Sequence, residues 1–89
     1  MKYEILNKLD KILTQHGFYI KYTSENAFNV ALAEDELPYC ELIQYDAKHI
    51  NMVLLTSYEN SEIETKRKAD QFMFIIIMFI INLVKPYLA

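Results

Sequence analysis

Two residue types that build common functional motifs are nearly absent from this chain of 89 residues, which has one glycine and one cysteine. A single glycine cannot form the glycine-rich loop that cradles a nucleotide phosphate. A single cysteine, Cys40, allows neither an internal disulfide nor a cysteine-based metal cluster. We therefore expect no cofactor and no metal site. A fold this small then needs another source of stability, and oligomerisation is a common one.

Positive charge is also scarce. Nine basic residues stand against twelve acidic ones, which gives a net charge of −3. The only basic cluster, at residues 66–68, is flanked by Glu62, Glu64 and Asp70 and reads as a solvated helix face. Because nucleic-acid binding usually needs a basic patch, this balance argues against a nucleic-acid partner.

The sequence contains no arrangement typical of a catalytic site. His16 and His49 are the only histidines, and neither lies in a motif with a serine or cysteine nucleophile. Cys40 is flanked by Tyr39 and Glu41 rather than by the cations that activate a thiol. The acidic run at residues 34–36 lacks the spacing of a calcium loop. We predict that the protein is not an enzyme.

The first residues and the free thiol indicate a compartment. Residues 1–16 carry charges throughout and have no continuous apolar segment, so we expect no signal peptide. A free cysteine without such a signal is typical of the reducing cytoplasm. The richness in Ile, Asn, Lys and Tyr is typical of an AT-rich bacterial or phage genome.

The hydrophobic pattern predicts two helices that flank four strands. Apolar residues at helical spacing predict a helix over residues 3–16, which Gly17 ends. Alternating residues joined by short polar links predict strands over residues 18–22, 27–33, 39–45 and 49–57. A second helix over residues 62–84 follows a capping box from Ser61 to Glu64 and stops before Pro86. We expect one α+β domain over residues 1–89, a two-layer sandwich with both helices packed on a four-stranded antiparallel meander.

Residues 72–84, FMFIIIMFIINLV, are apolar except for Asn82. A membrane-spanning helix needs about 20 apolar residues, and runs of about 10–14 are more often buried in a protein core. Asp70 and Gln71 precede the run, and Lys85 and Pro86 follow it. The alternative is a membrane-associated protein, with this helix inserted in a bilayer and residues 1–60 as a cytoplasmic cap.

On a helix, this apolar run divides into two faces. One stripe can cover the sheet, and its residues in the run are Phe72, Met73, Ile76, Phe79, Ile80 and Leu83. The opposite face carries Phe74, Ile77, Met78 and Ile81. A helix that is apolar all round is buried all round, so we predict that a second copy covers these four side chains in a homodimer. The other interpretation places the helix inside its own core.

The sheet face away from the helices is a second candidate surface. Strand alternation predicts that it carries Tyr19, Tyr39, Glu41 and Tyr45. Tyrosine is favoured in protein interfaces, so we predict that these residues bind a protein partner. An ordinary solvent-exposed sheet face would look the same. The resulting hypothesis is a small accessory, inhibitory or regulatory protein of bacterial or mobile-element origin, which binds an unidentified protein through this face or the acidic loop.

Overall fold

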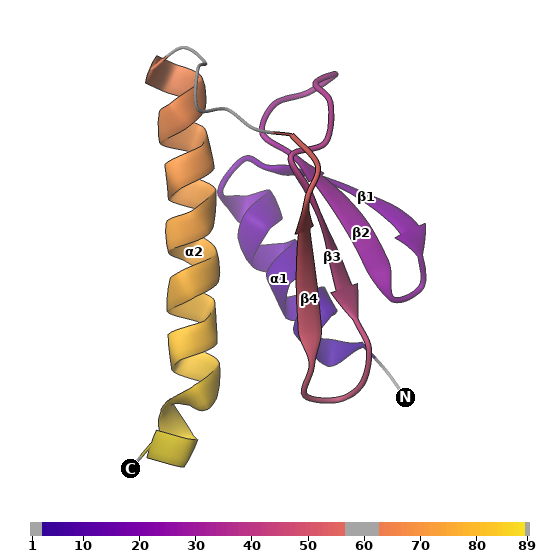
Figure 1. Ribbon diagram of the computed structural model, residues 1–89, viewed down its shortest axis with the longest axis vertical. Coiled ribbons are helices and arrows are strands. Elements are labelled where there is room, and N and C mark those ends of the chain that lie inside the picture. The colour runs from indigo at the N-terminus through magenta and orange to yellow at the C-terminus, as the bar shows by residue number, and fades with distance from the viewer. Residues whose placement is uncertain (1–2, 57–62, 89) are drawn as a thin grey trace. The chain divides into compact units, whose positions relative to one another are not determined.

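The computed structural model describes residues 3–56 and 63–88, with the side chains of the last helix described as far as Asn82. Its elements confirm the predicted α+β order (Figure 1): α1 (Glu4–Gln15), β1 (Tyr19–Ser24), β2 (Ala27–Ala31), β3 (Cys40–Gln44), β4 (Ile50–Leu54) and α2 (Ile63–Leu88). The four strands form one sheet in the order β1-β2-β3-β4, and each pairs antiparallel with the next. The chain divides into two compact units, Met1–Ser57 with α1 and the sheet, and Tyr58–Ala89 with α2.

Helix α1 ends at the only glycine, as the sequence predicts. Gly17 has a φ of 86°, a left-handed conformation that costs glycine little because it has no Cβ. The Gly17 N–H donates to the Thr14 carbonyl at 3.1 Å, and the Phe18 N–H donates to the Leu13 carbonyl at 3.0 Å. This pair of bonds is a Schellman motif. Phe18 and Leu13 are both buried, so the helix end also joins the core.

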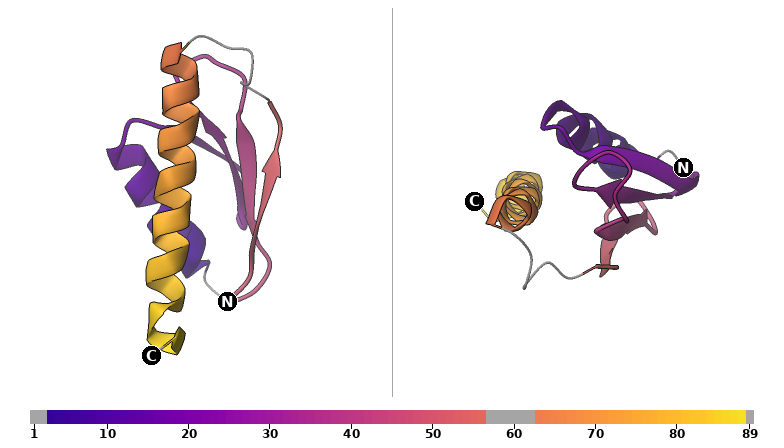
Figure 2. Two further views of the ribbon diagram at one scale, coloured as in Figure 1. Left: turned by 60° about the vertical axis from the view of Figure 1, so that its left-hand side comes forward. Right: turned by 90° about the horizontal axis from the view of Figure 1, so that it is seen from above.

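The strand register fixes which side chains share a face of the sheet. Tyr22 pairs with Phe28, which pairs with Leu42, which pairs with Met52, so these four point the same way. This face lies against α1, which contacts β1 and β3 (Figure 2). Its buried members form much of the core with the apolar stripe of α1: Phe28, Val30, Cys40 and Leu42 from the sheet, and Ile5, Leu6, Leu9 and Leu13 from the helix.

One buried polar residue, Gln44, joins the start of α1 to the end of β3. The backbone N–H of Leu6 is one of the N-terminal helix donors that have no partner within the helix. Tyr3 caps the helix without a side-chain hydrogen bond, and Gln44 Oε1 accepts from Leu6 N at 3.0 Å instead. Gln44 Nε2 donates to the Asp46 carbonyl at 2.8 Å. Gln44 therefore caps α1 from 38 residues away and holds the turn that leads to β4.

Helix α2 runs to Leu88, past the end predicted near Val84. A proline lacks the N–H that would bond to the carbonyl four residues earlier, and it strains the helix around that carbonyl. Pro86 lies in the last turn, so only the end of the helix bears this loss. Of the predicted capping box, Glu64 lies in the first turn of α2, whereas Ser61 lies outside the described residues.

Candidate interaction surfaces

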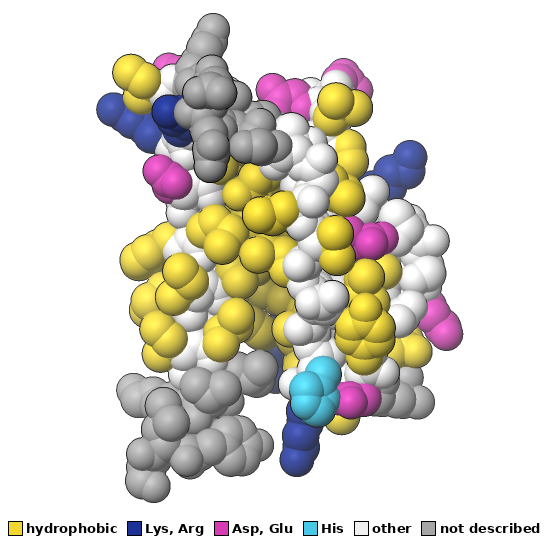
Figure 3. Space-filling model, viewed as in Figure 1, with side chains coloured by type: hydrophobic (Ala, Val, Ile, Leu, Met, Phe, Trp, Pro, Cys, Tyr) yellow, Lys and Arg dark blue, Asp and Glu magenta, His cyan; other side chains and the backbone are white. Residues whose placement is uncertain are grey.

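The predicted dimer-contact residues of α2 are exposed. Phe74, Ile77, Met78 and Ile81 have between 41% and 64% of their surface accessible. With about 100° between successive residues of a helix, these four fall within an arc of about 100°. Figure 3 shows hydrophobic side chains along this helix. The four residues, which we call the outer face of α2, form a continuous apolar strip.

Ile80 belongs to the other predicted stripe of the same helix, the one that begins at Phe72. The sequence places it with Phe72, yet Ile80 is exposed. Its position about 80° around the helix from Phe72 puts it on a flank between the two faces. The exposed apolar strip is thus wider than the four predicted residues.

The predicted partner-binding residues of the sheet are spread out rather than gathered. Tyr19 lies on edge strand β1 and Glu41 on β3, on the face that does not contact α1. Tyr45 follows β3, and its N–H donates to the His49 carbonyl at 3.0 Å. Along the strand direction Tyr19 and Tyr45 are three two-residue steps apart, about 20 Å. Both are exposed, but one small ligand could not contact both.

Tyr39 differs from the other three because it is buried, with 8% of its surface accessible. Its backbone is also engaged, since Tyr39 N donates to the Val30 carbonyl at 2.7 Å and its own carbonyl accepts from Leu55 N at 2.8 Å. Its side chain therefore offers little area to a partner. Strand alternation did not predict this burial, because Tyr39 precedes the regular part of β3. Its N–H bonds to the Val30 carbonyl, whereas Val30 pairs with Cys40 in the register of β2 and β3.

The centre of this sheet face is polar. The register places Lys21, Asn29 and Glu41 side by side on three neighbouring strands. Glu41 Oε2 accepts a hydrogen bond from Thr23 Oγ1 at 3.2 Å. Asn29 Oδ1 is buried, and among the described residues it has no hydrogen-bond partner. The row thus combines a cation, a carboxylate and an amide that could meet polar groups of a protein partner.

A shallow groove runs between α1 and edge strand β1, and Asp10, Thr14 and Tyr22 line part of it. Both carboxylate oxygens of Asp10 are occupied, because Thr14 Oγ1 donates to one at 3.1 Å and Tyr22 Oη donates to the other at 3.0 Å. Partial burial, then the hydrogen bond to Asp10 and its negative charge, raise the pKa of Tyr22 to about 12. The carboxylate of Asp10 in this groove is therefore already hydrogen-bonded within the chain.

The residues with catalytic potential lie apart from one another. Cys40 is fully buried, and burial raises the pKa of its thiol to about 12. His16 caps α1 and bonds through Nδ1 to the Ile12 carbonyl at 2.8 Å. In the residues described, no three His, Cys, Asp or Glu side chains form a group that could hold a metal ion.

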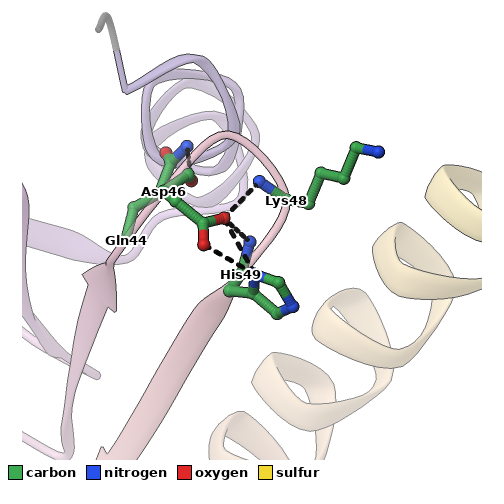
Figure 4. Close-up of polar contacts among 4 residues, drawn as sticks. All are labelled: Gln44, Asp46, Lys48 and His49. Atoms are coloured by element: carbon green, nitrogen blue, oxygen red, sulfur yellow. Dashed lines mark hydrogen bonds and ion pairs between the residues drawn. The ribbon is translucent and has the colours of Figure 1, made fainter.

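His49 instead belongs to the turn between β3 and β4 (Figure 4). Its Nδ1 lies 2.8 Å from Asp46. Asp46 Oδ1 also accepts from the backbone N–H groups of Lys48 at 2.8 Å and His49 at 3.0 Å. The Lys48 N–H bond first, and then the His49 contact, lower the pKa of Asp46 below its usual value. The arrangement is a self-contained turn that stabilises an aspartate.

In the part of the chain that the structure describes, no helix combines the length and apolar content needed to cross a bilayer. Comparisons with family models, curated proteins and solved structures found no match.

Proposed function

We propose that this protein is a non-enzymatic interaction module that associates with a second copy of itself through the outer face of α2. The observation that carries the proposal is the exposure of Phe74, Ile77, Met78 and Ile81 on one side of a helix. The role that follows is that of a cytoplasmic accessory, inhibitory or regulatory protein, which acts by binding another protein.

Helix α2 is apolar on all sides along residues 72–81. Residues 72–81 are all apolar. At about 100° a residue, ten successive residues surround the helix completely. A single neighbour covers one side only, so any placement against one neighbour leaves apolar side chains on another side. A second helix with the same apolar surface can pack against these remaining side chains and bury them.

The exposed side chains represent a substantial free energy. Complete burial of one large apolar side chain contributes about 1.5–3 kcal/mol. Because the four residues are already about half buried, covering the rest would contribute about 3–6 kcal/mol per chain. A typical domain is stable by only about 5–15 kcal/mol, so this gain is comparable with the stability of a small fold.

The partner protein is proposed to meet the sheet face that does not contact α1. Tyr19, Tyr45 and the polar row of Lys21, Asn29 and Glu41 supply aromatic area and charged groups there. Tyr39 is left out because its side chain is buried. Replacing Tyr19 and Tyr45 with alanine should remove a partner captured by the wild-type protein, and retention of every partner would refute this surface.

Self-association is tested by light scattering after gel filtration without detergent. The wild-type chain of 10.6 kDa should elute as an associated species of at least twice that mass. Ile77→Glu and Met78→Glu should each lower the mass, because both place a carboxylate in the apolar contact. Gln71→Glu is the matched control, since it adds the same charge at an exposed position of α2. A wild-type monomer, or recovery only in detergent, would refute the proposal.

A further inference from the structure

The outer edge of β4 is unpaired within residues 3–56, because β4 is the last strand in the sheet order. In an antiparallel ladder, residues alternate between those that bond to the neighbouring strand and those that point away from it. The bonds from Tyr45 N to His49 O and from Leu55 N to Tyr39 O fix the phase of this alternation. Asn51 and Val53 therefore bond toward β3.

The residues of opposite phase are Ile50, Met52 and Leu54. Each directs one backbone N–H and one carbonyl away from the sheet. Such a row of unpaired groups is a template for a further strand, and soluble proteins usually protect it with charge, proline or a bulge. Strand β1, the other edge, has these protections: it carries Lys21, and its pairing is irregular between Tyr22 and Ser24.

Strand β4 lacks them. Its five residues, INMVL, include neither a charged residue nor a proline, and its pairing with β3 is regular. Val53, Leu54 and the adjoining Leu55 are exposed, with 58% of Leu54 accessible. This combination is characteristic of an edge that another strand covers.

We propose that β4 pairs antiparallel with β4 of a second copy, across a two-fold axis at Met52. In this register Met52 lies opposite Met52 and Ile50 lies opposite Leu54, so the outward residue of each copy meets an outward residue of the other. Three such residue pairs, each exchanging two hydrogen bonds, satisfy every outward backbone group of the strand. The two sheets then form one continuous sheet of eight strands.

The side chains favour this register over its neighbours. Ile50, Met52 and Leu54 share one face, so all three pairs on that face are apolar. If one strand slides by two residues, only two of the three outward residues of each β4 still lie opposite an outward residue of the other β4. The pairing then loses one of its three residue pairs. Neither strand carries a charge, so the net charge of −3 produces no direct repulsion within the pairing.

The apolar area on the outer face of α2 is smaller than the area that a stable interface usually buries, so a further contact between the copies is expected. At about 25 cal/mol per Å², the four residues of its outer face account for about 250–500 Å² in a pair of copies. Stable interfaces usually bury about 1,200–2,000 Å². The inference rests on the proposed self-association, but it uses a different surface of the chain, so each surface can fail without the other.

Amide hydrogen exchange on the full chain gives the sharpest test. The amides of Asn51 and Val53 should be protected at every concentration, because they bond within the chain. The amides of Ile50, Met52 and Leu54 should be protected only where the protein is associated, and they should exchange faster on dilution. Fast exchange of these three in the associated protein would overturn the proposal. Equal protection in the monomer would do the same, since the chain itself would then cover the edge.

Two substitutions add an independent measurement by light scattering. Leu54→Lys should weaken self-association at least about tenfold, because it places an ammonium group over Ile50 of the second copy. Met52→Pro removes an outward N–H without removing a bond to β3 and should act in the same direction. Leu37→Lys is the control, because Leu37 is an exposed leucine in the loop before β3. Circular dichroism verifies that each variant is folded.

The variants separate the two proposals. If Leu54→Lys lowers the mass and Ile77→Glu does not, β4 is the contact and the α2 proposal fails. If Ile77→Glu lowers the mass while Leu54→Lys behaves like Leu37→Lys, the β4 pairing is refuted. A wild-type protein that is monomeric at all concentrations refutes both.

Discussion

Removal of the buried amide of Gln44 should destabilise the first unit of the chain. Gln44→Met keeps the length and approximate volume of the side chain and removes both of its hydrogen bonds. The Leu6 N–H is then left without a partner at a fully buried residue. The second hydrogen bond of Gln44, from Nε2 to the Asp46 carbonyl, is also lost, but Asp46 is exposed and water can take the place of this donor.

These losses set the expected magnitude. A buried hydrogen-bond donor without a partner costs about 1–3 kcal/mol of stability. Replacement of an N-cap side chain by alanine, which also leaves a helix N–H without its acceptor, costs about 0.5–2 kcal/mol. The apolar methionine recovers part of this through burial, so we expect a net loss of about 2 kcal/mol. For a domain of about 60–100 residues this corresponds to a fall in Tm of about 8–16 °C.

Urea unfolding followed by circular dichroism measures the change in the free energy of unfolding. Leu42→Met is the matched control, because Leu42 is buried on the same strand and the same face. A volume-conserving apolar exchange of this kind usually costs less than about 1.5 kcal/mol. Hydrogen exchange at Leu6 should accelerate in Gln44→Met and not in the control. If Gln44→Met costs no more than Leu42→Met, the capping argument is wrong.

Two further predictions concern the turns at either end of the sheet. Gly17→Ala should lower the free energy of unfolding by about 1–2 kcal/mol, because it forces a Cβ into the left-handed conformation. No atom lies within 4 Å of the new Cβ, so the cost is purely conformational, and a D-alanine introduced by chemical synthesis should not carry it. Asp46 has a pKa that is lower in the folded state, so its stabilising contribution is present above its unfolded pKa and is lost as the pH falls through the folded value. The pH dependence of unfolding below pH 5 should therefore be shallower in Asp46→Asn, and an unchanged slope would refute the role of the turn.

Local pattern was sufficient for most of the fold. The helical spacing of Ile5, Leu6, Leu9, Ile12, Leu13 and, more weakly, His16 predicted α1, and the only glycine marked its end. Ile12 is only half-buried and His16 is exposed, so the buried side is narrower than the predicted stripe. The change to a period of two, with short polar links, predicted the meander. These features depend on neighbours in the sequence, which is why one sequence was enough.

Features that depend on distant contacts were missed. The bond between Gln44 and Leu6 spans 38 residues, and its only signal in the sequence was a polar residue at an inward position of a strand. The burial of Tyr39 follows from backbone bonds to two other segments of the chain. The exposed apolar strip of α2 was predictable from helical spacing, whereas helical spacing alone does not encode whether another molecule contacts it.

The meander order has a consequence for how the protein is made. Each strand after β1 pairs with the strand that precedes it in the sequence, so β2, β3 and β4 each find a partner strand that has already been synthesised. Low separation between contacting residues favours fast folding, and domains can begin to fold while the ribosome is still adding residues. Each strand is briefly the open margin of a growing sheet until the next one arrives. Strand β4 is synthesised last, and in the described part of the chain no later strand pairs with its free edge.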